Sequence, residues 1–130
     1  MIASTPRGRS SRALPVWVAP AALFGVAGVA HLVRPAGFDT IVPRALPGPA
    51  RAWTHGSGVA ELALAAGFAL PATRRATSRA AAAFLVAVWP ANVQMAVDAW
   101  RSGSGARRAV TTLRLPLQVP LVRLALRAGR

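Results

Sequence analysis

Cysteine is absent from the 130-residue sequence, which excludes a disulfide bond, a thiolate metal site and a cysteine redox relay. Acidic residues are scarce, because Asp39, Glu61 and Asp98 are the only three. Charged residues make up 15% of the chain, whereas a soluble domain contains about a quarter. Lysine is also missing, so all 16 basic residues are arginine, which we interpret as a coding bias without functional meaning. The low charge content argues against an ordinary soluble domain.

Hydrophobic residues, by contrast, account for 54% of the chain and fall into four blocks separated by arginine- or proline-rich breaks. This pattern is typical of several membrane spans and not of one soluble core. We therefore expect an all-α, polytopic membrane protein built as a four-helix transmembrane bundle. The expected parts are a disordered basic N-terminal segment, 1–12, and a single transmembrane domain, 13–128, with spans at about 13–33, 51–70, 80–97 and 114–127.

The breaks between the blocks carry predictions of their own. Residues 34–50 contain four prolines, which exclude a regular helix through the segment. The same segment is too apolar for a solvated linker, so we expect an interfacial loop that folds back over the end of the bundle. Residues 98–112 are polar and contain two glycines, which predicts a second loop. Pro90 predicts a kink within the third span, and Pro116 predicts the start of the fourth.

The first apolar block admits a second interpretation, a cleaved signal peptide, because a basic segment precedes it. Its apolar run, 13–33, is longer than the roughly 7–15 residues of a typical signal-peptide core. Cleavage would also leave three spans of a four-part pattern. We therefore favour a membrane span.

The net charge of +13 raises the question of nucleic-acid binding. Nucleic-acid-binding proteins cluster arginines on one face with stacking aromatics between them. Here the arginines lie between the apolar blocks or at their ends, so anionic lipid headgroups are the natural counter-charge. The expected partner is the lipid bilayer of the cell membrane, and no nucleic acid is expected. Arginines gather in 1–12 and in the turn 74–79, which predicts a cytoplasmic N-terminus.

Glu61 is the most informative single residue, because it is the only carboxylate inside an apolar stretch. An ionisable side chain at that depth costs a few kcal/mol unless it faces the protein interior and has a partner. The predicted topology brings polar side chains of all four spans to the outer half of the bundle. We predict a polar binding pocket there, lined by His31, His55, Ser57, Glu61, Asn92, Arg114 and Gln118.

Two roles for Glu61 stay open. The carboxylate either holds the bundle together, by pairing with Arg114 or by hydrogen bonding to Asn92 and His31, or it moves protons and contacts a quinone headgroup. A metal site is not expected, because His55 and Glu61 are six residues apart and lie on opposite flanks of one helix. No nucleophile–base pair, phosphate loop or acid dyad is visible, so we predict no catalytic residues and do not expect an enzyme by itself.

A set of short motifs extends over most of the apolar part of the chain. The motifs are His31-x-x-x-Pro35, Phe38-x-x-Ile41-Val42-Pro43-x-x-Leu46-Pro47, Ser57-Gly58-x-x-Glu61, Pro71, Pro90-Ala91-Asn92-x-x-Met95-Ala96 and Arg114-Leu115-Pro116-Leu117-Gln118. No single motif is specific, but their order and spacing together are distinctive. In this respect the chain resembles the DoxX-like family of small four-helix membrane proteins, most of which are prokaryotic.

The resemblance implies an association with a membrane redox or respiratory assembly, as for the named members linked to terminal quinol oxidase or thiosulfate:quinone oxidoreductase complexes. Some redox-associated relatives carry cysteines, which this chain lacks, so a thiol relay is not expected. We expect an accessory or structural subunit whose partners are membrane or respiratory proteins or a second copy of the chain. One alternative is a quinone-interacting oxidoreductase component in which Glu61 and His31 move protons. The other is a carrier of small solutes or lipids.

Overall fold

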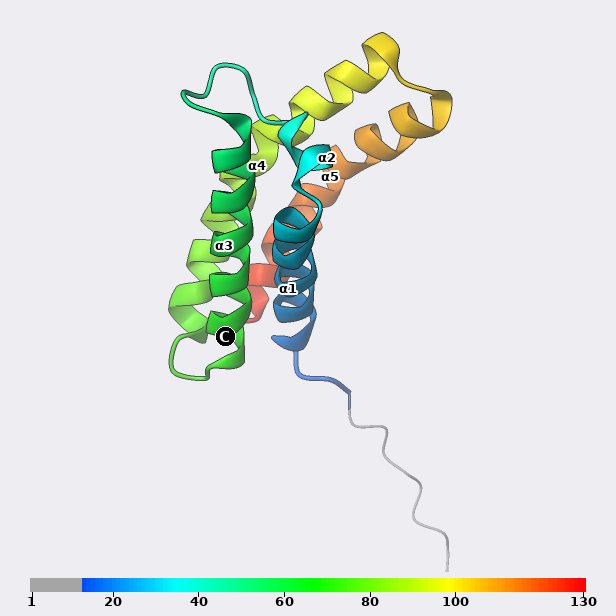
Figure 1. Ribbon diagram of the computed structural model, residues 1–130. Helices are drawn as coiled ribbons and strands as arrows, with labels where there is room; N and C mark the ends of the chain where they lie inside the picture. The colour runs from blue at the N-terminus through cyan, green and yellow to red at the C-terminus, as the bar shows by residue number, and fades with distance from the viewer. Residues whose placement is uncertain (1–12) are drawn as a thin grey trace, which may run out of the picture.

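The computed structural model describes residues 13–130, so the predicted basic segment 1–12 lies outside the described residues. Within the described part, all regular secondary structure is helix, and there is no strand. Five helices follow one another, α1 (Val18–Val33), α2 (Pro35–Asp39), α3 (Ala50–Ala69), α4 (Arg74–Ser102) and α5 (Gly105–Arg127) (Figure 1). The predicted all-α class is confirmed for this part of the chain.

Two of these helices, α4 and α5, are long and apolar enough to cross a membrane. They contain 29 and 23 residues, which correspond to about 43 and 35 Å at the helical rise. α1 is an apolar helix of 16 residues, or about 24 Å. α3 has 20 residues, but its content of Arg51, His55 and Glu61 lowers its hydropathy, and it falls outside this set.

Proline sets several helix boundaries. Pro35 begins α2, because its missing N–H falls where a first-turn residue has no helical partner. α3 follows Pro49 and ends before Pro71, whose ring disfavours a helical conformation for the residue before it. The segment 34–50 is therefore irregular as predicted, apart from the short helix α2.

Residues 98–112 form helix in place of the loop that the sequence predicts. α4 and α5 are separated only by Gly103 and Ser104. The Ser104 hydroxyl accepts the backbone N–H of Arg107 at 3.3 Å and so caps α5. α4 and α5 pack against each other and bury small residues such as Ala99 between them. This pairing stabilises helix in a segment whose polar composition alone favours a loop.

Prolines inside α4 and α5 bend these helices without ending them. Pro90 lies inside α4, and Pro116 and Pro120 lie inside α5, where each removes a helical hydrogen bond. Figure 1 shows the second half of α4 and the first half of α5, yellow to orange, leaning away from α1 and α3. We call residues 91–115 of this hairpin the arm. Pro90 lies inside α4, whereas Pro116 does not begin a helix but lies inside α5, and the span predicted at 114–127 is the second half of α5.

The helices associate as two pairs, α1 with α3 and α4 with α5. The pairs meet at the end where Phe24 of α1 stacks on Phe68 of α3, with ring centroids 6.2 Å apart, and meets the edge of Phe84 of α4. The buried core at this end comprises Phe24, Phe68, Ala81, Leu85, Ala125 and Ala128. From there the arm and the α1–α3 pair diverge (Figure 1).

Arg74 joins three helices at the same end. It begins α4, and it donates to the backbone carbonyl oxygens of Phe68 at 2.8 Å and Ala69 at 3.3 Å. These carbonyls close α3, where the last turn lacks backbone partners and favours a cation. The Arg74 guanidinium carbon also lies 4.5 Å from the ring centroid of Trp17, just before α1. Arg74 therefore fixes the α3–α4 turn against the start of α1.

Candidate functional site

His31 of α1 and Glu61 of α3 contact each other where these helices cross. The Nδ1 atom of His31 lies 2.8 Å from Oε2 of Glu61. The exposed fractions of the two side chains are 16% and 10%, so the contact is largely shielded from solvent. Among the residues of the predicted pocket, the structure brings these two into direct contact.

Nδ1 of His31 has a second close neighbour, the backbone carbonyl oxygen of Ala27 one turn earlier, at 2.8 Å. A carbonyl oxygen only accepts, so Nδ1 carries a proton and donates it to Ala27. Oε2 of Glu61 is then buried beside the same proton without a hydrogen bond of its own. The Nδ1 proton of His31 therefore lies between two oxygen atoms, the Ala27 carbonyl oxygen and Oε2 of Glu61. Of these two groups, only the Glu61 carboxylate acts as a base.

Two glycines allow α1 and α3 to approach closely at this point. A Cβ atom at Gly58 would lie 2.9 Å from Cβ of His31, and a Cβ atom at Gly28 would lie 2.8 Å from the Gly58 carbonyl oxygen. Both distances are shorter than ordinary contact distances, so a larger residue would force the helices apart. A close approach of α1 and α3 is therefore present at Gly58, whereas Gly56 faces open space.

The short helix α2 covers one face of the imidazole. The Phe38 ring stacks on His31 with centroids 3.8 Å apart and planes inclined by 28°. Phe38 belongs to one of the motifs noted in the sequence, but its contact with His31 depends on how the chain turns at Arg34. The spacing of the motif alone does not reveal this contact.

Asp39 and Arg51 tie α2 to α3. Nε of Arg51 donates to Oδ2 of Asp39 at 2.8 Å, and Nε1 of Trp53 donates to the carbonyl oxygen of Pro47 in the intervening loop at 2.8 Å. The Thr54 hydroxyl, together with Arg51, holds the pKa of the Asp39 carboxyl below its ordinary value of 3.8. Oδ1 of Asp39 and Oγ1 of Thr54 are nevertheless both buried without a hydrogen-bond partner. We therefore regard the direct Arg51 contact as the one that fixes α2.

Three other predicted pocket residues lie apart from the His31–Glu61 contact. His55 is exposed on α3, and Arg114 is exposed on the arm, so the predicted ion pair between Glu61 and Arg114 is not formed. Gln118 is buried, but its side-chain amide donates to the carbonyl oxygen of Leu85 in α4. That bond lies within the α4–α5 pair.

Asn92 and Ser57 complete the predicted set. Asn92 is half-buried on the arm, just beyond Pro90. Ser57 lies on a shallow groove of about 520 Å³ between the α2–α3 loop, α3 and α4, alongside Trp53 and Phe84. Because the arm leans away from α1 and α3, the polar residues of the two helix pairs do not converge on one pocket.

Metal-binding potential is limited in the part of the chain that the structure describes. Residues 13–130 contain no group of three or more His, Cys, Asp or Glu side chains close enough to hold an ion. The chemistry that the His31–Glu61 contact can perform by itself is the exchange of one proton between an imidazole and a carboxylate.

Comparison with other proteins adds a family assignment. The chain belongs to a protein family described as a domain of unknown function (DUF8561), which matches residues 21–129. A search of curated proteins found no match, and a search of solved structures found none. The matched region begins inside α1 and ends just after α5, so it contains the His31–Glu61 contact and the arm.

Proposed function

We propose that this member of the DUF8561 family is a multi-pass protein of the cell membrane that acts as an accessory or structural subunit of a membrane redox or respiratory assembly. In this proposal α1, α3, α4 and α5 each cross the bilayer, and the N-terminus is cytoplasmic. The proposal includes no catalytic residue.

The distribution of polar and apolar side chains carries the membrane part of the proposal. Buried polar residues include Thr54, Glu61 and Thr111, whereas large apolar residues such as Val26 and Val59 are 72% and 60% exposed. A soluble protein buries its large apolar side chains and exposes its polar ones. Large apolar side chains on the surface, together with polar side chains buried between helices, suit a hydrocarbon surrounding.

The way in which the buried polar groups are used supports a structural role. Gln118 bonds to the Leu85 carbonyl of a neighbouring helix, and His31 contacts Glu61 across a tight crossing that Phe38 covers. These contacts join helices in pairs and do not surround a common cavity. Buried polar contacts between membrane helices stabilise helix association. The redox or respiratory character of the assembly rests on the DoxX-like order of the motifs.

A second candidate function is favoured by one observation, the buried Oε2 atom of Glu61 without a hydrogen bond. In this alternative the chain is a quinone-interacting component, and Glu61 and His31 move protons. A quinone ring does not fit against the imidazole face that Phe38 already covers at 3.8 Å. The chemistry that the residues support is therefore limited to proton exchange between Nδ1 of His31 and Oε2 of Glu61.

Purification in mild detergent, followed by mass spectrometry of the retained proteins and small molecules, distinguishes the two candidates. The wild type is compared with Glu61→Gln and with His55→Gln, which changes an exposed histidine. We expect all three proteins to retain the same membrane-protein partner and no small molecule. Cross-linking should join that partner to the chain at defined residues.

Two results would change this conclusion. A quinone retained by the wild type and by His55→Gln, but lost from Glu61→Gln, would establish the second candidate. A chain that is fully inserted in the membrane but has no protein partner in any of the three preparations would exclude an accessory subunit.

A further inference from the structure

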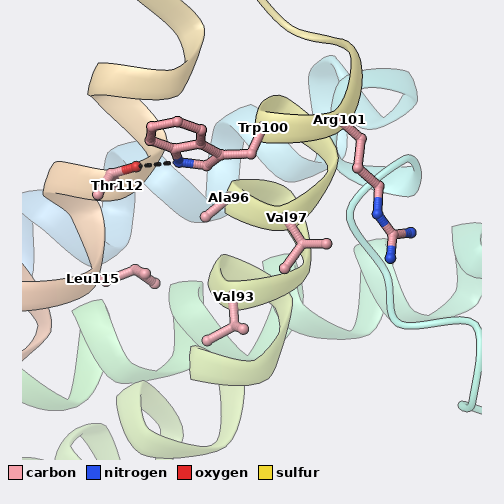
Figure 2. A pocket seen from close by; sticks show the side chains of 7 residues that line it. All are labelled: Val93, Ala96, Val97, Trp100, Arg101, Thr112 and Leu115. Carbon is pink, nitrogen blue, oxygen red and sulfur yellow. Dashed lines mark hydrogen bonds between the residues drawn. The ribbon is translucent and has the colours of Figure 1, made fainter.

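The arm contains a groove between α4 and α5 that lies apart from the His31–Glu61 contact. The groove has a volume of about 430 Å³ and is lined by Val93, Ala96, Val97, Trp100, Arg101, Thr112 and Leu115 (Figure 2). This volume falls within the range of about 300–1,000 Å³ that is usual for small-ligand sites. The groove exists because residues 98–112 are helical and extend the hairpin beyond Pro90.

The floor of the groove is apolar. Val93 and Val97 on α4 are each 38% exposed, and Leu115 of α5 lies across from them (Figure 2). Ala96 between the helices is small and buried, which leaves the space above it open. A floor of branched aliphatic side chains fits a flexible hydrocarbon chain better than a polar ligand.

The rim of the groove is polar, and a hydrogen bond holds one of its side chains in place. Nε1 of Trp100 donates to Oγ1 of Thr112 at 2.9 Å, which holds the indole between the two helices (Figure 2). Arg101 is exposed and extends from α4 on the side of Val97 (Figure 2). Within the part of the chain that the structure describes, the Arg101 side chain makes no ion pair and no hydrogen bond. Its guanidinium is therefore available to an anion at the end of the apolar floor.

The surroundings of the rim are strongly basic. Four arginines lie between residues 98 and 114, and the only acid there, Asp98, accepts a hydrogen bond from Gln94 at 3.0 Å. Arg108 contacts the Trp100 ring, with 5.6 Å between the guanidinium carbon and the centroid. The arm therefore presents uncompensated positive charge directly beside an apolar groove.

We propose that the groove of the arm binds one anionic phospholipid. One acyl chain lies on the floor formed by Val93, Val97 and Leu115, and the phosphate contacts Arg101. A soluble anion would leave the apolar floor exposed, and a neutral apolar molecule would leave the arginine charge uncompensated, whereas an anionic phospholipid satisfies both. This inference rests on the proposed membrane location and assigns a lipid class to it.

Quenching of Trp100 fluorescence by brominated lipids tests the proposal. The full chain, with Trp17, Trp53 and Trp89 each changed to Phe, is reconstituted in phosphatidylcholine vesicles. Equal small fractions of brominated phosphatidylglycerol or brominated phosphatidylcholine are then added. We expect apparent binding of the brominated phosphatidylglycerol to be about fivefold stronger, because one arginine contributes that order of preference for an anionic headgroup.

Two single substitutions make the result specific. Arg101→Gln should bring the ratio of the two lipids to about one, whereas Arg79→Gln, at the opposite end of α4, should leave the ratio unchanged. Equal quenching by both lipids, or an unchanged ratio in Arg101→Gln, would overturn the proposal. Weak quenching by both lipids, together with a dimer in light scattering, would assign the groove to a second copy of the chain.

A second measurement avoids the tryptophan substitutions. The wild type, Arg101→Gln and Arg79→Gln are extracted from phosphatidylglycerol-containing vesicles in mild detergent and examined by native mass spectrometry. One retained phosphatidylglycerol is expected in the first and third proteins and none in the second. Resistance of each protein to alkaline extraction is scored separately, since loss of insertion would contradict the proposed membrane function, whereas insertion without retained lipid would contradict only this inference.

Discussion

At His31, one ring proton faces two oxygen atoms, and the local contacts decide how it is shared. The Ala27 carbonyl comes from the same helix, so its position follows from helix geometry, whereas Glu61 comes from α3. Phe38 shields the ring from one side, which limits access of water to the contact. A carboxylate enclosed in this way depends on His31 more than an exposed carboxylate would.

Removing the imidazole nitrogen should therefore destabilise the protein. His31→Phe keeps a ring against Phe38 but leaves Glu61 buried without its partner, and we expect a loss of about 1–3 kcal/mol of unfolding free energy. His55→Phe, at an exposed position of α3, should change it by less than about 0.5 kcal/mol. Reversible unfolding in detergent micelles measures both.

The double substitution His31→Phe with Glu61→Leu provides the control. Because it removes both polar partners, it should recover most of the lost stability. A double variant as unstable as His31→Phe alone would show that the loss comes from packing and not from the unpaired carboxylate.

The contact between Asp39 and Arg51 should depend on pH. The pKa of Asp39 is lower in the folded protein than its ordinary value of 3.8, so the ionised form stabilises the fold above that value. This stabilisation is lost as the pH falls through the lowered pKa. We therefore expect the thermal stability advantage of the wild type over Asp39→Asn to disappear on acidification from about pH 6 to about pH 2.

Asp98→Asn serves as the comparison for this titration, because Asp98 lies on the arm and bonds to Gln94. A difference between the wild type and Asp39→Asn that did not change with pH would contradict the assignment. In that case the loss would come from the shape of the side chain and not from its charge.

α1 and α3 pack closely against each other, and this follows from where their glycines lie. Gly28 and Gly58 occupy the crossing itself, where an added Cβ would have no room. Gly56 lies in the same helix as Gly58 but on a face with open space. Glycine therefore permits close helix packing at position 58 but has no packing role at position 56.

This difference predicts opposite effects of one substitution. Gly58→Ala should lower the unfolding free energy by about 1–3 kcal/mol, because the helices must separate to admit the methyl group. Gly56→Ala should raise it by about 0.5–1 kcal/mol, since alanine loses less backbone entropy in a helix. Unfolding of both variants under one condition measures the contrast, and equal effects would place the crossing elsewhere.

In the whole molecule, the two helix pairs place the connecting segments at two opposite ends. The α2–α3 loop and the tip of the arm lie toward one end of the molecule, and the α3–α4 turn lies at the other (Figure 1). In the proposed topology, with a cytoplasmic N-terminus and four spans, the α2–α3 loop and the tip of the arm face outside and the α3–α4 turn faces the cytoplasm.

Labelling with a membrane-impermeant maleimide tests this topology. Because the chain has no cysteine, a single introduced one reports unambiguously. Ala45→Cys and Ser104→Cys should react in intact cells, and Ala72→Cys should react only after the membrane is permeabilised. Reaction of Ala72→Cys alone in intact cells would reverse the orientation, and reaction of all three would contradict four spans.

The sequence by itself determined the helical class, both ends of α3 and the C-terminal ends of α1 and α5 to within one residue, and the position of Glu61 inside an apolar helix. The lengths of the apolar blocks, the positions of the prolines and the presence of one carboxylate in an apolar stretch are local properties of the sequence. They can therefore be identified without knowing which segments contact each other. Small residues at 56 and 58 favour a close helix approach, but only the structure shows that Gly58, and not Gly56, lies at the crossing.

Only the tertiary structure decided which polar residues meet. Arg114 and Gln118 lie in the same helix, yet one is exposed on the arm and the other bonds to Leu85, because prolines bend α4 and α5 away from the α1–α3 pair. The polar segment 98–112 became helix because two helices pack together there, which no property of the segment alone shows. Contacts between distant segments depend on how helices bend and pair, and that information is not contained in local spacing.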